Sequence, residues 1–256
     1  MTAPAVTVLI PNYQGHEAIA LCLESIMART HTTDYSILVY DNLGDGQDRA
    51  YLRGMQGVRR IELIENDGMT RKPGESMTEL ATACRTRYAC FLESDCEIID
   101  GGWLALMLGL IGKHPQTIGV GRYFKAGPHC LTFFAPVWGP ECLLIDMDLY
   151  RPIAEPNDWQ QRSIPTELYP YADIFNGIRP PEGYDGTVNL DTCWRFTEKI
   201  EFERERGLRI EPLPLTFFAT HVRHYGGIST RGHRPEIQPR WEAIRARLAE
   251  LRKGWA

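Results

Sequence analysis

Three carboxylates occur at alternate positions in one short stretch of this sequence. Glu93, Asp95 and Glu97 lie in the run ESDCE, which directly follows the apolar segment YACFL. Gathering this much negative charge at the end of a buried strand costs free energy unless a cation offsets it. Carboxylate oxygens suit Mg²⁺ or Mn²⁺, and both ions also bind phosphate groups. The stretch therefore predicts a divalent-metal site, with an ordinary solvated turn as the alternative.

Two histidines late in the chain have a spacing that brings imidazoles to one metal. His221 and His224 form a His-x-x-His pair, and Gly226 and Gly227 follow it. The glycines allow the backbone to approach a ligand closely. We expect His224 rather than His221 to be the ligand, and imidazole favours Mn²⁺ over Mg²⁺. The alternative for each histidine is a purely structural role.

Further polar residues follow the earlier apolar runs. Asp41 and Asn42 come after YSILVY, Tyr13 lies in PNYQG after VTVLIP, and Arg71 and Lys72 lie in NDGMTRKPG. The two cations can offset phosphate charge. The alternatives are a turn cap for Asp41, a packed loop aromatic for Tyr13 and a solvated basic pair for Arg71 and Lys72.

Alternating strands and helices are expected to position these residues. In the first hundred residues the pattern predicts strands at 6–11, 35–40, 58–64 and 88–92, and helices at 17–29 and 75–87. Such alternation is typical of a parallel sheet with helices on both faces. Ligands bind beyond the carboxyl ends of strands in these sheets, which is where the polar residues lie.

The second half has a less regular pattern. It predicts strands at 117–124, 141–145, 208–213 and 215–219, and helices at 101–112, 191–206 and 240–252. The segment 151–186 holds six of the 17 prolines and several aromatic residues. A long irregular segment with this composition favours an ordered binding loop.

Composition and length describe a soluble globular chain. The 256 residues are 43% hydrophobic and 24% charged, which excludes disorder, and the length suits one large domain or two small ones. The most apolar stretch has 12 residues, GGWLALMLGLIG, against roughly 20 needed to cross a bilayer. We therefore expect no integral membrane segment and a cytoplasmic location. The odd number of cysteines, seven, predicts free and mostly buried thiols.

Four segments resemble glycosyltransferase family 2, and they occur in the family's order: VTVLIPNYQG, YSILVYDNLGDG, YACFLESDCEI and HYGGIS. The resemblance implies the GT-A α/β fold. This is a Rossmann-like, mostly parallel sheet flanked by helices on both faces, with a smaller mixed sheet on the acceptor side. It also implies a single domain, with a nucleotide-sugar half at 1–100 and an acceptor half at 101–221. Residues 222–256 would return a metal ligand and add a basic C-terminal helix.

The resemblance implies transfer of a sugar from a nucleotide-sugar donor, most often a UDP-sugar, to an acceptor hydroxyl, with inversion. Mn²⁺ or Mg²⁺ would sit on the diphosphate, bound by Asp95 and His224. Glu93 replaces the first Asp of the family's Asp-x-Asp motif and would reach the ribose or a metal-bound water. Pro11 and Tyr13 would line the base pocket. The rest of the implied donor site is Asp41, which would accept from the base edge, with Asn42, Arg71, Lys72 and Ser94.

The expected Glu-Asp pair that supplies a general base in this family is missing from the matching region, YDGTVNLDTCWRF. Asp191 would open the helix there, where an anion is favoured by the helix dipole, and is the first candidate base. A plain helix cap is its alternative role. Asp185, in a Tyr-Asp-Gly turn, is the second candidate base.

Two other classes of protein remain open at this point. A sugar nucleotidyltransferase also combines an α/β sheet with a carboxylate-bound metal, but PNYQGHE is not its Gly-rich basic loop. A non-catalytic sugar- or nucleotide-binding protein would explain the missing Glu-Asp pair.

The last 35 residues carry a net charge of +5, against −10 for residues 1–221. This basic segment suggests an anionic acceptor, such as a nucleic acid, a lipid-linked sugar or an acidic glycan. The alternative is the solvated face of a packed helix.

Overall fold

The structure is a computed structural model that describes residues 5–31, 33–42, 46–66, 68–125, 127–129, 132–134, 137–165, 187–226 and 235–254. Its centre is a seven-stranded sheet with the strand order β12-β6-β9-β4-β1-β2-β3. The strands are β1 (Val6–Asn12), β2 (Tyr35–Asp41), β3 (Ile61–Glu65), β4 (Tyr88–Leu92), β6 (Thr117–Phe124), β9 (Val137–Asp146) and β12 (Arg209–Pro212).

Neighbouring strands of this sheet are parallel except around β9, which pairs antiparallel with both β4 and β6. The predicted mostly parallel sheet is therefore confirmed. The carboxyl ends of β1, β2, β3 and β4 all meet at one edge, as expected from the polar residues that follow them.

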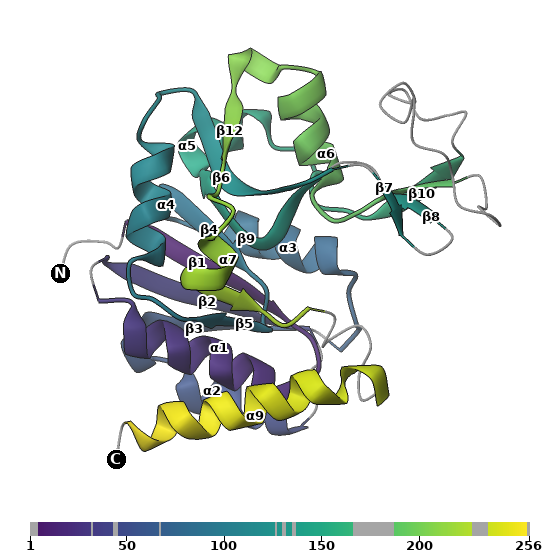
Figure 1. The fold of residues 1–256 in the computed structure, drawn as a ribbon. Helices are drawn as coiled ribbons and strands as arrows, with labels where there is room; N and C mark the ends of the chain where they lie inside the picture. Colours follow the sequence, from purple (N-terminus) through teal and green to yellow (C-terminus); the bar gives the residue numbers. More distant parts are fainter. Residues whose placement is uncertain are drawn as a thin grey trace.

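Helices cover both faces of the sheet (Figure 1). On one face, α1 (His16–Arg29), α2 (Gly46–Met55) and α4 (Trp103–Ile111) contribute to an apolar cluster with alternate side chains of β1, β2 and β4. On the other face, α3 (Pro73–Ala83) and α6 (Trp194–Thr197) pack on the remaining side chains, together with α5 (Met147–Tyr150). Burial of these two clusters from water is the main driving force for this architecture.

Two smaller sheets flank the central one. A four-stranded mixed sheet has the order β10-β11-β8-β7, with bounds Arg162–Pro165, Thr187–Leu190, Thr132–Phe134 and Gly127–His129. A two-stranded antiparallel sheet joins β5 (Cys96–Ile98) to β13 (Val222–His224). The smaller mixed sheet was predicted, whereas the pairing of β5 with β13 was not.

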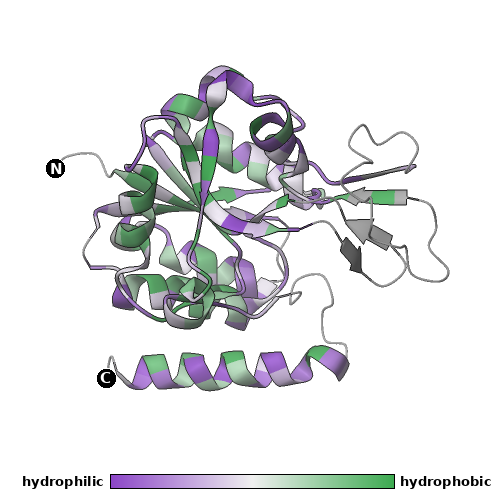
Figure 2. Cartoon of the chain, turned by 45° about the horizontal axis from the view of Figure 1, so that its top comes forward, coloured by the Kyte–Doolittle hydropathy of each residue, from purple (hydrophilic) through white to green (hydrophobic). Residues whose placement is uncertain are grey.

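The C-terminal helix α9 (Gln238–Lys253) lies along α1, and its apolar side chains Trp241, Ile244 and Leu248 pack there. Figure 2 shows that hydrophilic residues recur along this helix between the apolar ones. The predicted helix at 240–252 is confirmed, and its packed face is the one with spacings of three and four residues.

Four predicted elements differ from the structure, three of them in their bounds or type. The helix predicted at 75–87 ends at Ala83, because Cys84 is extended and the chain turns into β4. The strand predicted at 215–219 is the short helix α7 (Phe217–Thr220), with Phe217 buried and Leu215 fully exposed. The strand predicted at 58–64 begins later, at Ile61, because Val58–Arg60 form a 3₁₀ turn ahead of β3.

The helix predicted at 191–206 is also wrong. The segment is broken into α6, a π-turn (Glu198–Phe202) and a 3₁₀ turn (Glu205–Gly207), with left-handed backbone at Cys193, Arg204 and Arg206. A buried ion pair accounts for part of this, because Lys199 Nζ lies 2.6 Å from Asp158 Oδ1. Tertiary contacts of this kind override local helical spacing.

No helix among the described residues is long and apolar enough to cross a membrane. The six cysteines in the described ranges are all buried and none forms a disulfide, as predicted. Most of the predicted binding loop at 151–186 falls outside the described residues. Within the described part, Trp159 is buried against Phe91, Tyr150 and Phe196, so it belongs to the core.

Candidate active site

A cavity of about 570 Å³ opens at the carboxyl edge of the central sheet. This volume lies in the range of roughly 300–1,000 Å³ that is typical of small-molecule sites. Its walls come from the ends of β1, β2 and β4, from the start of α3 and the loop before it, and from residues directly before β10 and directly after β11. The lining residues are Pro11, Asn12, Tyr13, Asn42, Thr70, Arg71, Pro73, Ser76, Glu93, Ser94, Asp95, Gln161, Asp191 and Thr192.

Eight of the residues singled out in the sequence thus share one cavity, although β1 and Asp191 are far apart in the chain. Three predicted residues within the described part are not among the lining set: Asp41, Lys72 and His224. Asp185 lies outside the described residues. His224 is not on the cavity wall but contacts two residues that are.

Asp41 is fully buried, and its Oδ2 accepts a hydrogen bond from Arg49 Nε at 2.8 Å. Arg49 lies on α2, so this ion pair joins the end of β2 to the next helix. The carboxylate therefore has a partner within the protein. Of the two consecutive residues Asp41 and Asn42, only Asn42 reaches the cavity wall.

The loop that follows β3 is held by asparagine side chains. Asn42 Oδ1 accepts from the Arg71 backbone N–H at 2.7 Å, and Asn42 Nδ2 donates to the Arg71 carbonyl at 2.6 Å. Asn66 Nδ2 also donates to Asn42 Oδ1, at 3.0 Å. This bidentate arrangement fixes the Arg71 backbone beside the cavity, and the Arg71 guanidinium Nη1 lies 3.9 Å from Glu79 Oε1.

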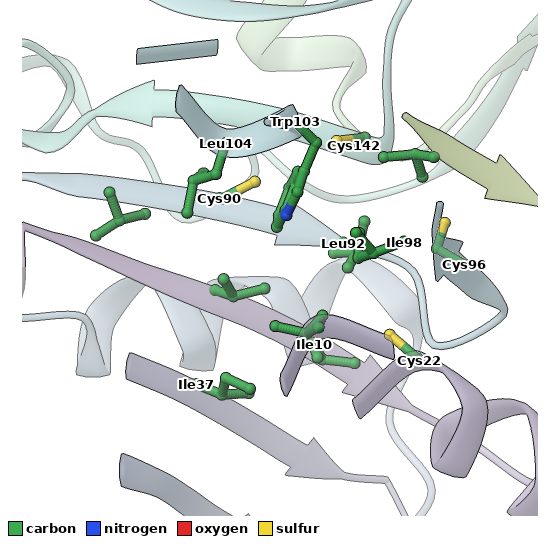
Figure 3. Packing of buried hydrophobic residues seen from close by; sticks show 14 of the residues in the cluster. Ile10, Cys22, Ile37, Cys90, Leu92, Cys96, Ile98, Trp103, Leu104 and Cys142 are labelled. Atoms are coloured by element: carbon green, nitrogen blue, oxygen red, sulfur yellow. The ribbon is translucent and has the colours of Figure 1, made fainter. Parts of the chain in front are cut away.

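The predicted metal ligands come together in the structure. His224 Nε2 lies 2.7 Å from Glu93 Oε2 and 3.2 Å from Asp95 Oδ1. Glu93 and Asp95 follow β4, whereas His224 ends β13, so the antiparallel pairing of β13 with β5 brings the histidine to the carboxylates. Leu92 and Ile98, on either side of this acidic segment in the chain, are buried in the apolar cluster on the α1 face (Figure 3).

The charges in this cluster perturb one another. Burial alone lowers the pKa of His224, but contacts with Asp95 and Glu93 outweigh it and raise the pKa to about 11. Burial and then the charge of Asp95 raise the pKa of Glu93, against the opposing effect of His224. Strongly coupled ionisable groups in a cavity are a common mark of a functional site.

The donor set fits a divalent cation. Nε2 of His224 is buried and lies within contact distance of both carboxylates. Two carboxylate oxygens and an imidazole nitrogen therefore converge on one small space. This combination of hard oxygen ligands and one imidazole suits Mn²⁺.

Cys96 also lies close to Asp95 and His224. Its thiol, however, donates to the Glu141 carbonyl at 3.3 Å, and its side chain belongs to the apolar cluster on the α1 face. Burial and then the charge of Asp95 raise its pKa. Thiols bind metals as thiolates, so Cys96 is a poor ligand here.

Glu141, on β9, is an acidic residue near this cluster that the sequence analysis did not select. It is 2% exposed, and burial followed by the charge of Glu93 raises its pKa to about 7. Arg122 Nη1 lies 3.8 Å from Glu141 Oε1. A glutamate inside the otherwise apolar strand WGPECLLI was the signal that could have found it.

His221 takes a different position from His224. Its Nδ1 lies 3.0 Å from Asp100 Oδ1, outside the cavity. The preference for His224 over His221 thus agrees with the contacts of the two side chains. His221 and Asp100 form a second histidine–aspartate pair on the same two segments.

Asp191 lines the cavity from the segment that directly follows β11. Its Oδ1 accepts from the Thr192 backbone N–H at 2.8 Å, and its carbonyl accepts from the Trp194 N–H at 3.0 Å. The charge of Asp191 contributes to the raised pKa of Glu93, so the two carboxylates are near each other. Asp191 does not cap a long helix, because α6 has only four residues.

Six lining residues were not singled out in the sequence: Asn12, Thr70, Pro73, Ser76, Gln161 and Thr192. Gln161 reaches the cavity because the chain packs tightly on α3. A Cβ on Gly74 would meet the Trp159 carbonyl oxygen at 2.1 Å, so only glycine allows this approach.

Comparisons with known proteins agree with this geometry. The sequence profile described as "Glycosyl transferase family 2" matches residues 7–140, which is more than half of the chain. The chain therefore belongs to glycosyltransferase family 2, and it is a glycosyltransferase. The nucleotidyltransferase and the non-catalytic protein considered from the sequence are not supported. No curated protein sequence matches the chain.

Solved structures of similar fold include the mannosyltransferase PcManGT from Pyrobaculum calidifontis, in complex with GDP-Man and Mn²⁺. It is 13% identical, with a TM-score of 0.50 over 98% of this chain and 86% of that one. A second is TarS 1-349 from S. aureus, at 12% identity and a TM-score of 0.46, over 96% and 80% of the two chains. At 13% identity the likeness to the mannosyltransferase shows the GT-A fold alone.

Proposed function

We propose that this chain transfers a sugar from a nucleotide-sugar, with a UDP-sugar as the first candidate, to an acceptor hydroxyl, with inversion and with a divalent cation. The observation that carries the proposal is the convergence of Glu93, Asp95 and His224 at a cavity that also holds Arg71 and Asp191. The cavity thus combines a cation site, a cationic side chain for phosphate and a separate carboxylate.

In the proposed reaction, Asp95 and His224 hold the cation and Glu93 completes their cluster. When bound, Mn²⁺ or Mg²⁺ supplies positive charge against the diphosphate leaving group. Pro11, Tyr13 and Asn42 would form the wall against the nucleoside, and Arg71 would pair with phosphate oxygens.

Asp191 is the proposed general base. Its carboxylate would accept the proton of the acceptor hydroxyl while the hydroxyl oxygen bonds to the anomeric carbon. The bond from that carbon to the diphosphate oxygen breaks in the same step, and the diphosphate keeps the electron pair. Attack on the face opposite the leaving group inverts the anomeric centre.

An anionic acceptor stays a prediction. Its basis is narrower than the net charge of the last 35 residues suggests, because Arg223, Arg245, Arg247 and Arg252 all contact glutamates of this chain. Arginines that are paired in this way are less available for a nucleic acid or an acidic glycan.

Calorimetric titration tests the donor and the metal together. UDP, GDP and their sugar conjugates are titrated into the chain with Mn²⁺ and again with EDTA, and hydrolysis of each bound donor is followed. We expect binding of one nucleotide class that requires Mn²⁺ and is lost in Asp95→Ala. Asp100→Ala is the matched control, because this aspartate pairs with a histidine but lies outside the cavity. Metal-independent binding, or equal binding by Asp95→Ala, would overturn the proposal.

A further inference from the structure

Glu97 is a buried carboxylate that the proposed reaction does not use. It lies on β5, two residues after Asp95, and is 2% exposed. Its Oε2 accepts hydrogen bonds from Arg223 Nη1 at 3.0 Å and from the Tyr225 hydroxyl at 2.9 Å. Its Oε1 accepts from Arg247 Nε at 3.0 Å. Both oxygens are therefore occupied, and two guanidinium groups offset the buried charge.

Two of these donors flank His224 in the sequence. Successive side chains of an extended strand point to opposite sides, so Arg223 and Tyr225 share one side and His224 takes the other. Since Arg223 and Tyr225 both reach the same oxygen of Glu97, the orientation of this strand about its own axis is fixed. The imidazole then faces Glu93 and Asp95, as its contacts show.

The strand that carries His224 is short. β13 has three residues and, among the described residues, pairs with β5, with Arg223 opposite Glu97 and His224 opposite Cys96. The buried Val222 side chain and the Tyr225 N–H, which donates to the Asp95 carbonyl at 3.1 Å, also help to hold it. A two-stranded ribbon of this length is marginal by itself. A slip of one residue would turn His224 away from the carboxylates, because side chains alternate with a period of two. The ion pair between the directly opposite Arg223 and Glu97 works against that slip.

The third donor comes from the C-terminal helix. Arg247 lies on α9, which is anchored on α1 through the apolar contacts of Trp241, Ile244 and Leu248. Arg247 reaches Glu97 from there, 150 positions along the chain. The helix therefore adds a fixed cation to the side of β5 that faces away from His224.

We propose that Glu97 is a positioning residue that holds Asp95 and His224 in place for one divalent cation, and that α9 supports it through Arg247. This inference rests on the metal site of the proposed function. It gives the basic C-terminal segment a role within the protein. Glu97 would orient the metal ligands without binding the metal itself. Substitution of residues with this role typically lowers metal affinity roughly 10- to 100-fold.

Glu24 provides a matched control. It is also a buried glutamate that accepts from an arginine of α9, Arg252, and from a tyrosine hydroxyl, Tyr51. Unlike Glu97, it lies on α1, and Tyr51 and Arg252, which donate to it, lie on α2 and α9 and not on β13. Glu24→Gln thus disturbs the attachment of α9 without touching the strand that carries His224.

The test compares the whole chain with Glu97→Gln and Glu24→Gln. Mn²⁺ affinity is measured from the electron paramagnetic resonance signal of free Mn²⁺, and amide exchange of residues 222–225 is followed by mass spectrometry. We expect Glu97→Gln to weaken Mn²⁺ binding at least about tenfold and to speed exchange in that segment. Glu24→Gln should stay within about twofold of the unmodified chain in both measurements.

Mn²⁺ affinity within twofold for Glu97→Gln, or an equal loss in Glu24→Gln, would overturn the positioning role. If Glu97→Gln does not fold, Tyr225→Phe carries the test, with weaker Mn²⁺ binding expected at an unchanged melting temperature. Absence of Mn²⁺ binding by the unmodified chain would instead remove the metal from the proposed function. The exchange rates would still decide whether Glu97 holds β13.

Discussion

Charged residues are arranged in opposite ways at the sheet edge and along the C-terminal helix. At the edge, Glu93 and Asp95 gather around one imidazole, and the pKa of Glu93 and of His224 is displaced as a result. Along α9, Arg245, Arg247 and Arg252 each pair with a carboxylate of the body, such as Arg245 with Glu17. The sequence shows that both regions are charged, but it does not show which of the charges are paired.

The comparison shows that a pair of opposite charges and a cluster of like charges have different roles in this protein. Pairs such as Arg252 with Glu24 balance within the protein and attach one helix to another. A cluster of carboxylates is unfavourable by itself, so a cation that binds there is stabilised. The predictions below test this contrast, from the largest expected effect to the smallest.

Removal of a cluster member should abolish most transfer. Asp95→Ala and His224→Ala are each expected to lower the turnover of the donor about 10³-fold or more, because the charge on the leaving diphosphate is no longer offset. Turnover with saturating Mn²⁺ measures the effect. His221→Ala and Asp100→Ala, which break a pair outside the cavity, should stay within a few fold; equal losses in both sets would contradict the contrast.

Asp191→Asn should lower transfer about 10²- to 10³-fold, because an amide cannot accept the acceptor proton. Donor affinity, measured by calorimetry, should stay within about threefold, since the variant keeps the size of the side chain. A large loss of donor affinity with unchanged turnover would place Asp191 at the donor and not at the acceptor hydroxyl.

Glu141 makes stability depend on pH. The pKa of Glu141 is about 7 in the folded chain, against 4.5 for an unperturbed glutamate, which is the value expected in the unfolded chain. The unfolded state therefore loses this proton first as the pH rises. The protein then loses stability between about pH 4.5 and 7, and carries the whole cost above pH 7, in the order of about 1–3 kcal/mol.

Glu141→Gln should remove that cost. Urea unfolding in EDTA should show the variant gaining about 1–3 kcal/mol relative to the unmodified chain on going from pH 5 to pH 8. Glu62→Gln, at an exposed position of β3, is the control and should show little change with pH. A difference between Glu141→Gln and the unmodified chain that is the same at both pH values would refute the assignment.

The smallest effect is expected for a paired arginine of the helix. Arg245→Ala breaks the contact with Glu17 at 3.0 Å, in which both side chains are partly exposed. Such surface pairs contribute about 0–1 kcal/mol. Chemical denaturation should therefore show a loss of no more than about 1 kcal/mol, with transfer unchanged. A strong loss of transfer with one acceptor would point to an anionic acceptor at this helix.

Much of the site follows from patterns in short segments. Apolar runs that end in polar residues are local features, and the parallel arrangement of β1, β2 and β4 places their ends together. For this reason Tyr13, Asn42 and Asp95 could be assigned to one site before any coordinates. Asp41 fits the same pattern, yet the structure pairs it with Arg49, because position at a strand end does not specify which side chains meet.

The sequence by itself determined the α/β class, the mostly parallel sheet and the acidic edge, since each depends on periodicity within a few residues. Only the tertiary structure decided that β13 pairs with β5, that Glu97 takes up Arg247, and that Glu141 is buried beside the cluster. These contacts join segments that are far apart in the chain. Their free energy depends on packing and desolvation in three dimensions, for which a local pattern of residue types carries no signal.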